Sequence, residues 1–141
     1  MKKTIIFALM ILIAAGSALA AGNRTSADKA GKVSVKKATG QNAVTVEEVY
    51  RDSAKLAGKK VVIRGKVVKV TGGILDKNWI HIQDGTGSSD MGNYDLTCTT
   101  SEPLPRKGSV VTISGTLVTN RDFGAGYFYS VIVENATFSK K

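Results

Sequence analysis

The chain has 141 residues, of which 20 are lysine or arginine and 11 are aspartate or glutamate, giving a formal net charge of +9. Its one cysteine, Cys98, excludes an intramolecular disulfide, so stability must come from packing. The excess of positive charge indicates polyanionic partners such as nucleic acid, anionic lipid or acidic glycan, although it also serves solubility.

Residues 1–20 have the layout of a secretory signal peptide. Two lysines precede an apolar run, and Ala18-Leu19-Ala20 provides a small-residue cleavage site. We expect cleavage after Ala20, leaving 121 residues that carry a charge of +7 and have no stable membrane anchor, in the periplasm or secreted. That length suits one domain rather than two. A retained N-terminal anchor is the alternative.

The next segment, residues 21–44, is rich in Gly, Ala, Ser, Thr and Lys and has no aromatic residue. Such a composition cannot bury enough surface to stay ordered, so it predicts a flexible basic tail. Thr45 then stands where the N-cap of a short helix would lie, with Glu47 and Glu48 in the first turn. Gly58 is expected to end this helix.

One phrase, G-x-x-V-x-I-x-G-x-(V/L)-V, occurs twice, starting at Gly58 and at Gly108. Apolar and polar residues alternate in both copies, which predicts two strands that each bury one face. Gly65 and Gly115 interrupt the buried positions at the same place, and a missing side chain lets a strand bend or bulge. Two long bent strands in one small domain predict a sheet curled into a closed or partly open barrel.

Five strands are predicted, over residues 60–70, 79–83, 94–100, 109–119 and 127–134. Asp84 to Gly87 form a turn signal after the second strand, and residues 139–141 form a C-terminal tail. Pro103 and Pro105 leave no room for a helix between the third and fourth strands, so the helix before the first strand is expected to cover the open end. Cys98 alternates with Leu96 and is expected to be a small core residue.

These elements resemble the oligonucleotide/oligosaccharide-binding (OB) fold, specifically small exported bacterial OB-fold proteins and tRNA-anticodon-type OB domains. The resemblance is carried by the first strand at 61–70, the phrase NWIHIQDGTG at 78–87 and the fourth strand at 111–117. It implies an all-β, five-stranded Greek-key barrel over residues 45–138, with a short N-terminal helix. It also implies a ligand surface on the second and third strands, between loops 71–78 and 120–126.

The second strand supplies three candidate ligand-binding residues. Ile80 and Ile82 are expected inside, which turns Trp79, His81 and Gln83 to the opposite face. There Trp79 can stack on a base or a sugar ring, His81 can stack or hydrogen-bond, and Gln83 can read polar edges. Alternatively, the N-terminal helix lies across this face and buries Trp79.

Basic residues are concentrated around the first strand. Between positions 51 and 77 the chain carries eight positive and two negative side chains. We therefore add Arg64 and Lys66 on the strand, and Lys77 and Asn78 in the following loop, to the candidate ligand-binding residues. Such a stripe can neutralise the phosphates of single-stranded nucleic acid. The alternative is that these side chains only form a surface exposed to solvent.

The loop 120–126 contributes Arg121 and Phe123 to the candidate ligand-binding residues. Phe123 is either an exposed stacking element or a hydrophobic plug that closes one end of the barrel. In the strand that follows, Tyr129, Val131 and Val133 are expected to be interior.

Catalysis finds little support in the sequence. His81 is the one histidine, and no catalytic motif, metal site or phosphate-cradling loop is recognisable, so we expect a non-enzyme without a cofactor. Two function classes remain. One is a module that binds single-stranded nucleic acid or another anionic polymer; the other is an exported accessory module that binds a protein partner or a cell-wall glycan.

Overall fold

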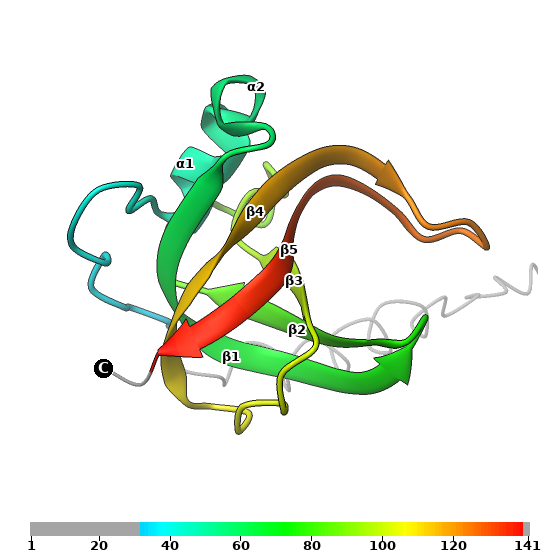
Figure 1. Ribbon diagram of the computed structural model, residues 1–141. Helices are drawn as coiled ribbons and strands as arrows, with labels where there is room; N and C mark the ends of the chain where they lie inside the picture. The colour runs from blue at the N-terminus through cyan, green and yellow to red at the C-terminus, as the bar shows by residue number, and fades with distance from the viewer. Residues whose placement is uncertain (1–31, 140–141) are drawn as a thin grey trace, which may run out of the picture. The chain divides into compact units, whose positions relative to one another are not determined.

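The computed structural model describes residues 32–139, and Figure 1 shows their arrangement. Two short helices, α1 (Val46–Arg51) and α2 (Ser53–Leu56), precede five strands. The strands are β1 (Lys60–Ile74), β2 (Lys77–Gln83), β3 (Leu96–Thr100), β4 (Val110–Asp122) and β5 (Phe128–Ser139). The all-β prediction is confirmed.

Several sequence predictions concern the chain ends. The predicted signal peptide, residues 21–31 of the predicted tail, and residues 140 and 141 lie outside the described residues. Ser139, predicted to begin the C-terminal tail, belongs to β5 instead. Within residues 32–139, no helix is both long enough and apolar enough to cross a membrane.

The five strands form one sheet in the order β1-β2-β3-β5-β4, which closes because β1 also pairs with β4. Every pair is antiparallel except β3 with β5. The length of β1 lets it serve two neighbours: residues 60–66 pair with β4 and residues 66–74 pair with β2. The strands run further than predicted, so most of the two predicted ligand loops belongs to the β1–β2 and β4–β5 hairpins.

Alternate side chains of the strands point into the barrel and form its core, as the period-two pattern predicts. Every strand contributes, and the cluster includes Val61, Ile63, Val67, Ile80, Ile82, Leu96, Cys98, Val111, Ile113, Leu117, Val131 and Val133. Burial raises the pKa of the Cys98 thiol, which therefore stays protonated. This confirms Cys98 as a core residue.

Helix α1 closes one end of the barrel. Thr45 caps it with a reciprocal capping box that includes Glu48. Val46 and Val49 are fully buried in the same hydrophobic cluster as the inward residues of the strands. The buried Asp84 holds the helix in place, because its Oδ2 accepts a hydrogen bond of 2.9 Å from the amide of Val46.

The end of this helical segment differs in detail from the prediction. The expected single helix is divided at Asp52 into α1 and α2, and the second part ends at Leu56 with Ala57 as its C-cap. Gly58 follows directly with a φ of +77°, a left-handed conformation that favours glycine after a helix end.

The two glycines inside the repeated phrase, Gly65 and Gly115, have different structural roles. Gly115 lies at an irregularity in the pairing of β4 with β5, and a Cβ there would lie 2.6 Å from Cγ1 of Val133. Gly65 pairs regularly with β4, and its missing side chain makes room for Ile82. The bulge in β1 falls at Val68 instead. The repeated phrase therefore correctly predicts a bulge at the second glycine only.

Residues 32–44, named here the strap, run along the barrel in cyan in Figure 1. The free edge of β1 binds them: the amide of Val62 donates to the carbonyl of Asn42, and its carbonyl accepts from the amide of Val44, each at 2.9 Å. The prediction of a flexible tail through residue 44 is therefore wrong for the strap. Composition did not reveal this contact, because backbone groups of a distant strand provide it.

Tyr50 ties α1 to the residue that precedes β3, because its hydroxyl donates to the carbonyl of Asp95 at 2.6 Å. Burial, reinforced by the nearby Asp95 carboxylate, raises the pKa of Tyr50 to about 12. The folded protein thus favours the neutral phenol. Its contribution to stability is complete below the ordinary tyrosine pKa near 10 and is lost as the pH rises through 12.

We expect Tyr50→Phe to lower the free energy of unfolding by about 1 kcal/mol at pH 7, because one hydrogen bond is lost. The variant should also lose less stability than the native protein between pH 10 and 12, by roughly 1 kcal/mol after allowing for the partial exposure of the ring. Urea unfolding at a series of pH values measures both effects. The exposed Tyr94 provides the control Tyr94→Phe. Parallel pH curves for native protein and Tyr50→Phe would contradict this account.

Candidate ligand-binding surface

Strand β2 presents its two faces as predicted. Ile80 and Ile82 are fully buried in the core, so Trp79, His81 and Gln83 face outward. Their neighbours on β3 are outward threonines: Trp79 pairs with Thr99, and His81 pairs with Thr97.

Trp79 nevertheless is only 5% exposed, so the expectation of an open stacking platform is wrong. Its ring centroid lies 5.2 Å from that of Phe123, 5.7 Å from Tyr129 and 6.3 Å from Tyr127. Its indole nitrogen donates to the carbonyl of Ile74 at 2.7 Å. The aromatic rings that pack on Trp79 belong to the β4–β5 hairpin, so the alternative of burial under the N-terminal helix is also wrong.

The β4–β5 hairpin reaches beyond the barrel, on the same side as the β1–β2 hairpin (Figure 1). Phe123 at its end is half-buried and meets the indole edge to face, at an interplanar angle of 71°. It is therefore neither a free stacking tip nor a plug inside the barrel. The Arg121 guanidinium lies 4.6 Å from the Phe123 ring centroid, and its Nε lies 3.5 Å from a carboxylate oxygen of Glu134.

The inward-pointing residues expected in the last strand have two different environments. Val131 and Val133 are buried in the core, as predicted. Tyr129 is half-buried and packs on Trp79 and Phe123 instead of joining the core, which corrects the expectation that it is interior.

Asp95 orients two of the outward residues on β2. Its Oδ1 lies 2.6 Å from Nδ1 of His81, and its Oδ2 accepts a 2.9 Å hydrogen bond from the side-chain nitrogen Nε2 of Gln83. Sequence reasoning did not select Asp95 as a site residue. Its polar position in the alternation of the predicted third strand was the available signal.

A small hollow of about 190 Å³ opens beside Trp79, and we name it the aromatic pocket. Its principal lining residues are Lys69, Thr71, Trp79, His81, Tyr127 and Tyr129. Tyr127 is 40% exposed and is the most accessible aromatic ring of this set. The predicted site residues Trp79 and His81 thus meet at one pocket, whereas Lys69 and Tyr127 were missed as site residues.

A row of outward cations on β1 leads into this pocket. Lys66 lies opposite Gln83, and Lys69 lies opposite His81, although three positions separate the two lysines. The bulge at Val68 absorbs the extra residue and keeps both lysines on the outward face. Among residues 32–139, the four ion pairs involve neither lysine.

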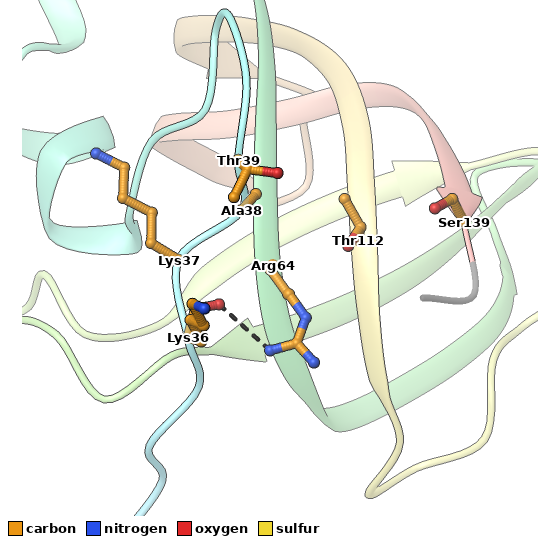
Figure 2. Close-up of a pocket in the computed structure, with 7 residues that line it drawn as sticks. All are labelled: Lys36, Lys37, Ala38, Thr39, Arg64, Thr112 and Ser139. Atoms are coloured by element: carbon orange, nitrogen blue, oxygen red, sulfur yellow. Dashed lines mark hydrogen bonds between the residues drawn. The ribbon is translucent and has the colours of Figure 1, made fainter.

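Arg64 lies elsewhere. It pairs with Thr112 on β4, and its Nη1 donates to the carbonyl of Lys36 in the strap at 3.3 Å. Figure 2 shows its guanidinium between the strap and β4. The structure therefore does not bring Arg64 together with Trp79.

Lys77 and Asn78 lie at the start of β2 and are half-buried. The side-chain oxygen of Asn78 accepts from the amide of Gly73, and its nitrogen donates to the carbonyl of Glu102 at 2.9 Å. Asn78 thus braces the β1–β2 hairpin against the segment after β3, a structural role that leaves few of its polar groups for a ligand.

The reactive side chains do not gather. His81 faces outward while Cys98 is buried inside the barrel, and Asp84 and Asp122 accept hydrogen bonds from local backbone amides. Within the part of the chain that the structure describes, no group of three or more His, Cys, Asp or Glu side chains could hold a metal ion.

Comparison of the sequence with models of known protein families and with curated proteins found no match.

Proposed function

We propose that this protein is a non-enzymatic OB-fold module that binds single-stranded nucleic acid, or another extended anionic polymer, on the outward face of β1 and β2. The strand order β1-β2-β3-β5-β4 and the Greek-key connection that it requires support the OB assignment. Helix α1 takes the capping place of the helix that such barrels often carry between the third and fourth strands.

The observation that carries the ligand proposal is the row of Lys66 and Lys69 leading to the aromatic pocket. The two lysines stand opposite residues that are two positions apart on β2, so their backbones are separated by about 6.6 Å. This spacing of the lysines suits successive phosphates of an extended nucleic-acid strand. Neither lysine has a carboxylate partner within residues 32–139, so each is available to a phosphate.

The aromatic pocket supplies the second half of the proposed contact. Tyr127 and His81 are accessible enough to contact a base, whereas the buried Trp79 supports the pocket wall. Base stacking on an aromatic side chain contributes about 1 to 3 kcal/mol and tolerates any sequence. We therefore expect binding with little sequence preference and a strong dependence on salt.

Export is part of this proposal. The signal-peptide layout of residues 1–20 supports a periplasmic or secreted location. In that location the polymer need not be nucleic acid, and an anionic glycan would meet the same lysine row.

The double variant Lys66→Gln/Lys69→Gln tests the lysine row. We expect weaker binding of fluorescent oligo-dT, and a slope of log affinity against log salt that is smaller by about 1.4, because two single-strand phosphate contacts are lost. Fluorescence anisotropy at several salt concentrations measures the slope. The matched control, Lys55→Gln/Lys59→Gln, removes the same charge from exposed positions outside this face. Equal slopes in the two variants would show that net charge alone attracts the oligonucleotide.

One observation favours the alternative of a protein or glycan partner. Phe128 is 58% exposed on the β4–β5 hairpin, close to the accessible Tyr127. If this hairpin docks on such a partner, soluble cell-wall fragments should bind independently of salt, and Phe128→Ala should weaken that binding while leaving oligo-dT affinity unchanged.

A further inference from the structure

We propose that the hollow around Arg64 is a phosphoryl-binding site, separate from the aromatic pocket and independent of the polymer ligand proposed above. It is open, has a volume of about 460 Å³ and lies between the strap and strands β1, β4 and β5 (Figure 2). The polar residues that line it are Lys36, Lys37, Thr39, Arg64, Thr112 and Ser139.

Three donors of this hollow form one row across neighbouring strands. Arg64 on β1 pairs with Thr112 on β4, and Thr112 pairs with Ser139 on β5. Paired residues project to the same face, and adjacent strands are about 4.8 Å apart. A guanidinium and two hydroxyl groups therefore point to the same side of the sheet, and the strap forms the facing wall.

The charge of the hollow is uncompensated. Arg64 is half-buried, and within the described part of the chain its guanidinium donates one hydrogen bond, to the carbonyl of Lys36, which leaves other N–H groups able to donate. Among residues 32–139, no aspartate or glutamate lines the hollow. Lys37 turns away and pairs with Glu48 at 2.9 Å, so the Arg64 guanidinium supplies the positive charge that faces an incoming anion.

This donor set fits a phosphoryl group better than a carboxylate. A guanidinium fork alone satisfies both oxygens of a carboxylate. A tetrahedral phosphoryl group presents a third oxygen, and the hydroxyls of Thr112 and Ser139 are placed to bind it. The open form of the hollow admits a phosphoryl group carried by a larger molecule as well as free phosphate.

The site can be tested apart from the aromatic pocket because the two are well separated on β1. Thr71, which lines the aromatic pocket, is seven positions beyond Arg64, roughly 20 Å along an extended strand. A small anion bound at Arg64 therefore does not reach the aromatic pocket, although Lys66 of the lysine row lies only two positions from Arg64 on the same face of β1.

Titration of the protein with inorganic phosphate and with pyrophosphate, followed by amide chemical shifts, tests the site. We expect shifts centred on Arg64, Thr112 and Ser139, and an affinity lowered about 10- to 100-fold in Arg64→Gln, since charge-assisted hydrogen bonds are lost. Lys55→Gln removes the same charge from an exposed position on α2 that does not line the hollow, and should change the affinity less than about twofold. The dispersion of the same spectra shows whether each variant is folded.

The proposal is overturned if neither anion shifts these resonances, or if Arg64→Gln and Lys55→Gln weaken binding equally. An oligonucleotide with a terminal phosphate, compared with the same oligonucleotide without it, distinguishes the source of the phosphoryl group. If the native protein prefers the phosphorylated oligonucleotide and Arg64→Gln loses that preference, the ligand of the hollow is the phosphorylated end of a polymer. If both oligonucleotides bind equally well while inorganic phosphate still binds, the ligand is free phosphate. Failure of the lysine row to bind oligo-dT leaves these results unchanged, so the two proposals fail separately.

Discussion

Gly115→Ala is expected to destabilise the barrel by about 3 kcal/mol or more, because the new methyl group has no space. Its Cβ would lie 2.6 Å from Cγ1 of Val133, 2.9 Å from the carbonyl oxygen of Glu134 and 3.2 Å from Cα of Ala136. Two of these atoms belong to the backbone of β5 at an irregularity in its pairing, so they cannot rotate away as a side chain would. Urea unfolding followed by far-ultraviolet circular dichroism measures the loss.

Two other glycines of the strands provide graded controls. At Gly65 the added Cβ would lie 3.1 Å from Cβ of Ile82, so Gly65→Ala should cost less than Gly115→Ala, about 1 to 2 kcal/mol. At the exposed Gly72 the nearest atom is the side-chain oxygen of Asn78 at 3.3 Å, and Gly72→Ala should change stability by less than about 1 kcal/mol. Similar losses in all three variants would show that backbone freedom, not close contact, explains these glycines.

Trp79→Ala is expected to lower the free energy of unfolding by about 3 to 5 kcal/mol, because a buried indole and its contacts with three aromatic rings are lost. The lost hydrogen bond to the carbonyl of Ile74 adds to this cost. Chemical denaturation measures the change, and the native protein should show the blue-shifted emission of an indole that is shielded from water.

Phe128→Ala is the matched control for Trp79→Ala, since it removes a large ring from the same hairpin region at an exposed position. It should cost less than about 1 kcal/mol. If Trp79→Ala kept its stability and lost only ligand affinity, the indole would be an exposed contact residue and the packing described above would be wrong. The functional test therefore uses Lys66 and Lys69, whose removal does not open the aromatic cluster.

The separation of Arg64 from Trp79 shows where reasoning from one strand reaches its limit. Both residues belong to an outward face, and alternation predicted that correctly. However, β1 is long enough to leave β4 and join β2, so its first half faces the strap and its second half faces the aromatic pocket. The alternation of apolar and polar residues predicts whether a side chain points inward or outward. Which other segments lie beside it depends on the strand with which that part of β1 pairs.

Sequence reasoning alone was enough to predict the all-β class, the approximate positions of the strands, their inward residues apart from Tyr129, the Thr45 cap and the place of Cys98. These follow from local alternation, turn chemistry and capping, which act over a few residues. Three features became visible only in the folded chain: Trp79 is covered by a hairpin more than forty positions later, the strap binds the edge of β1, and Asp95 orients His81 and Gln83. Those contacts join residues that are far apart along the chain, and they depend on strand order and on the β1 bulge, neither of which leaves a local pattern in the sequence.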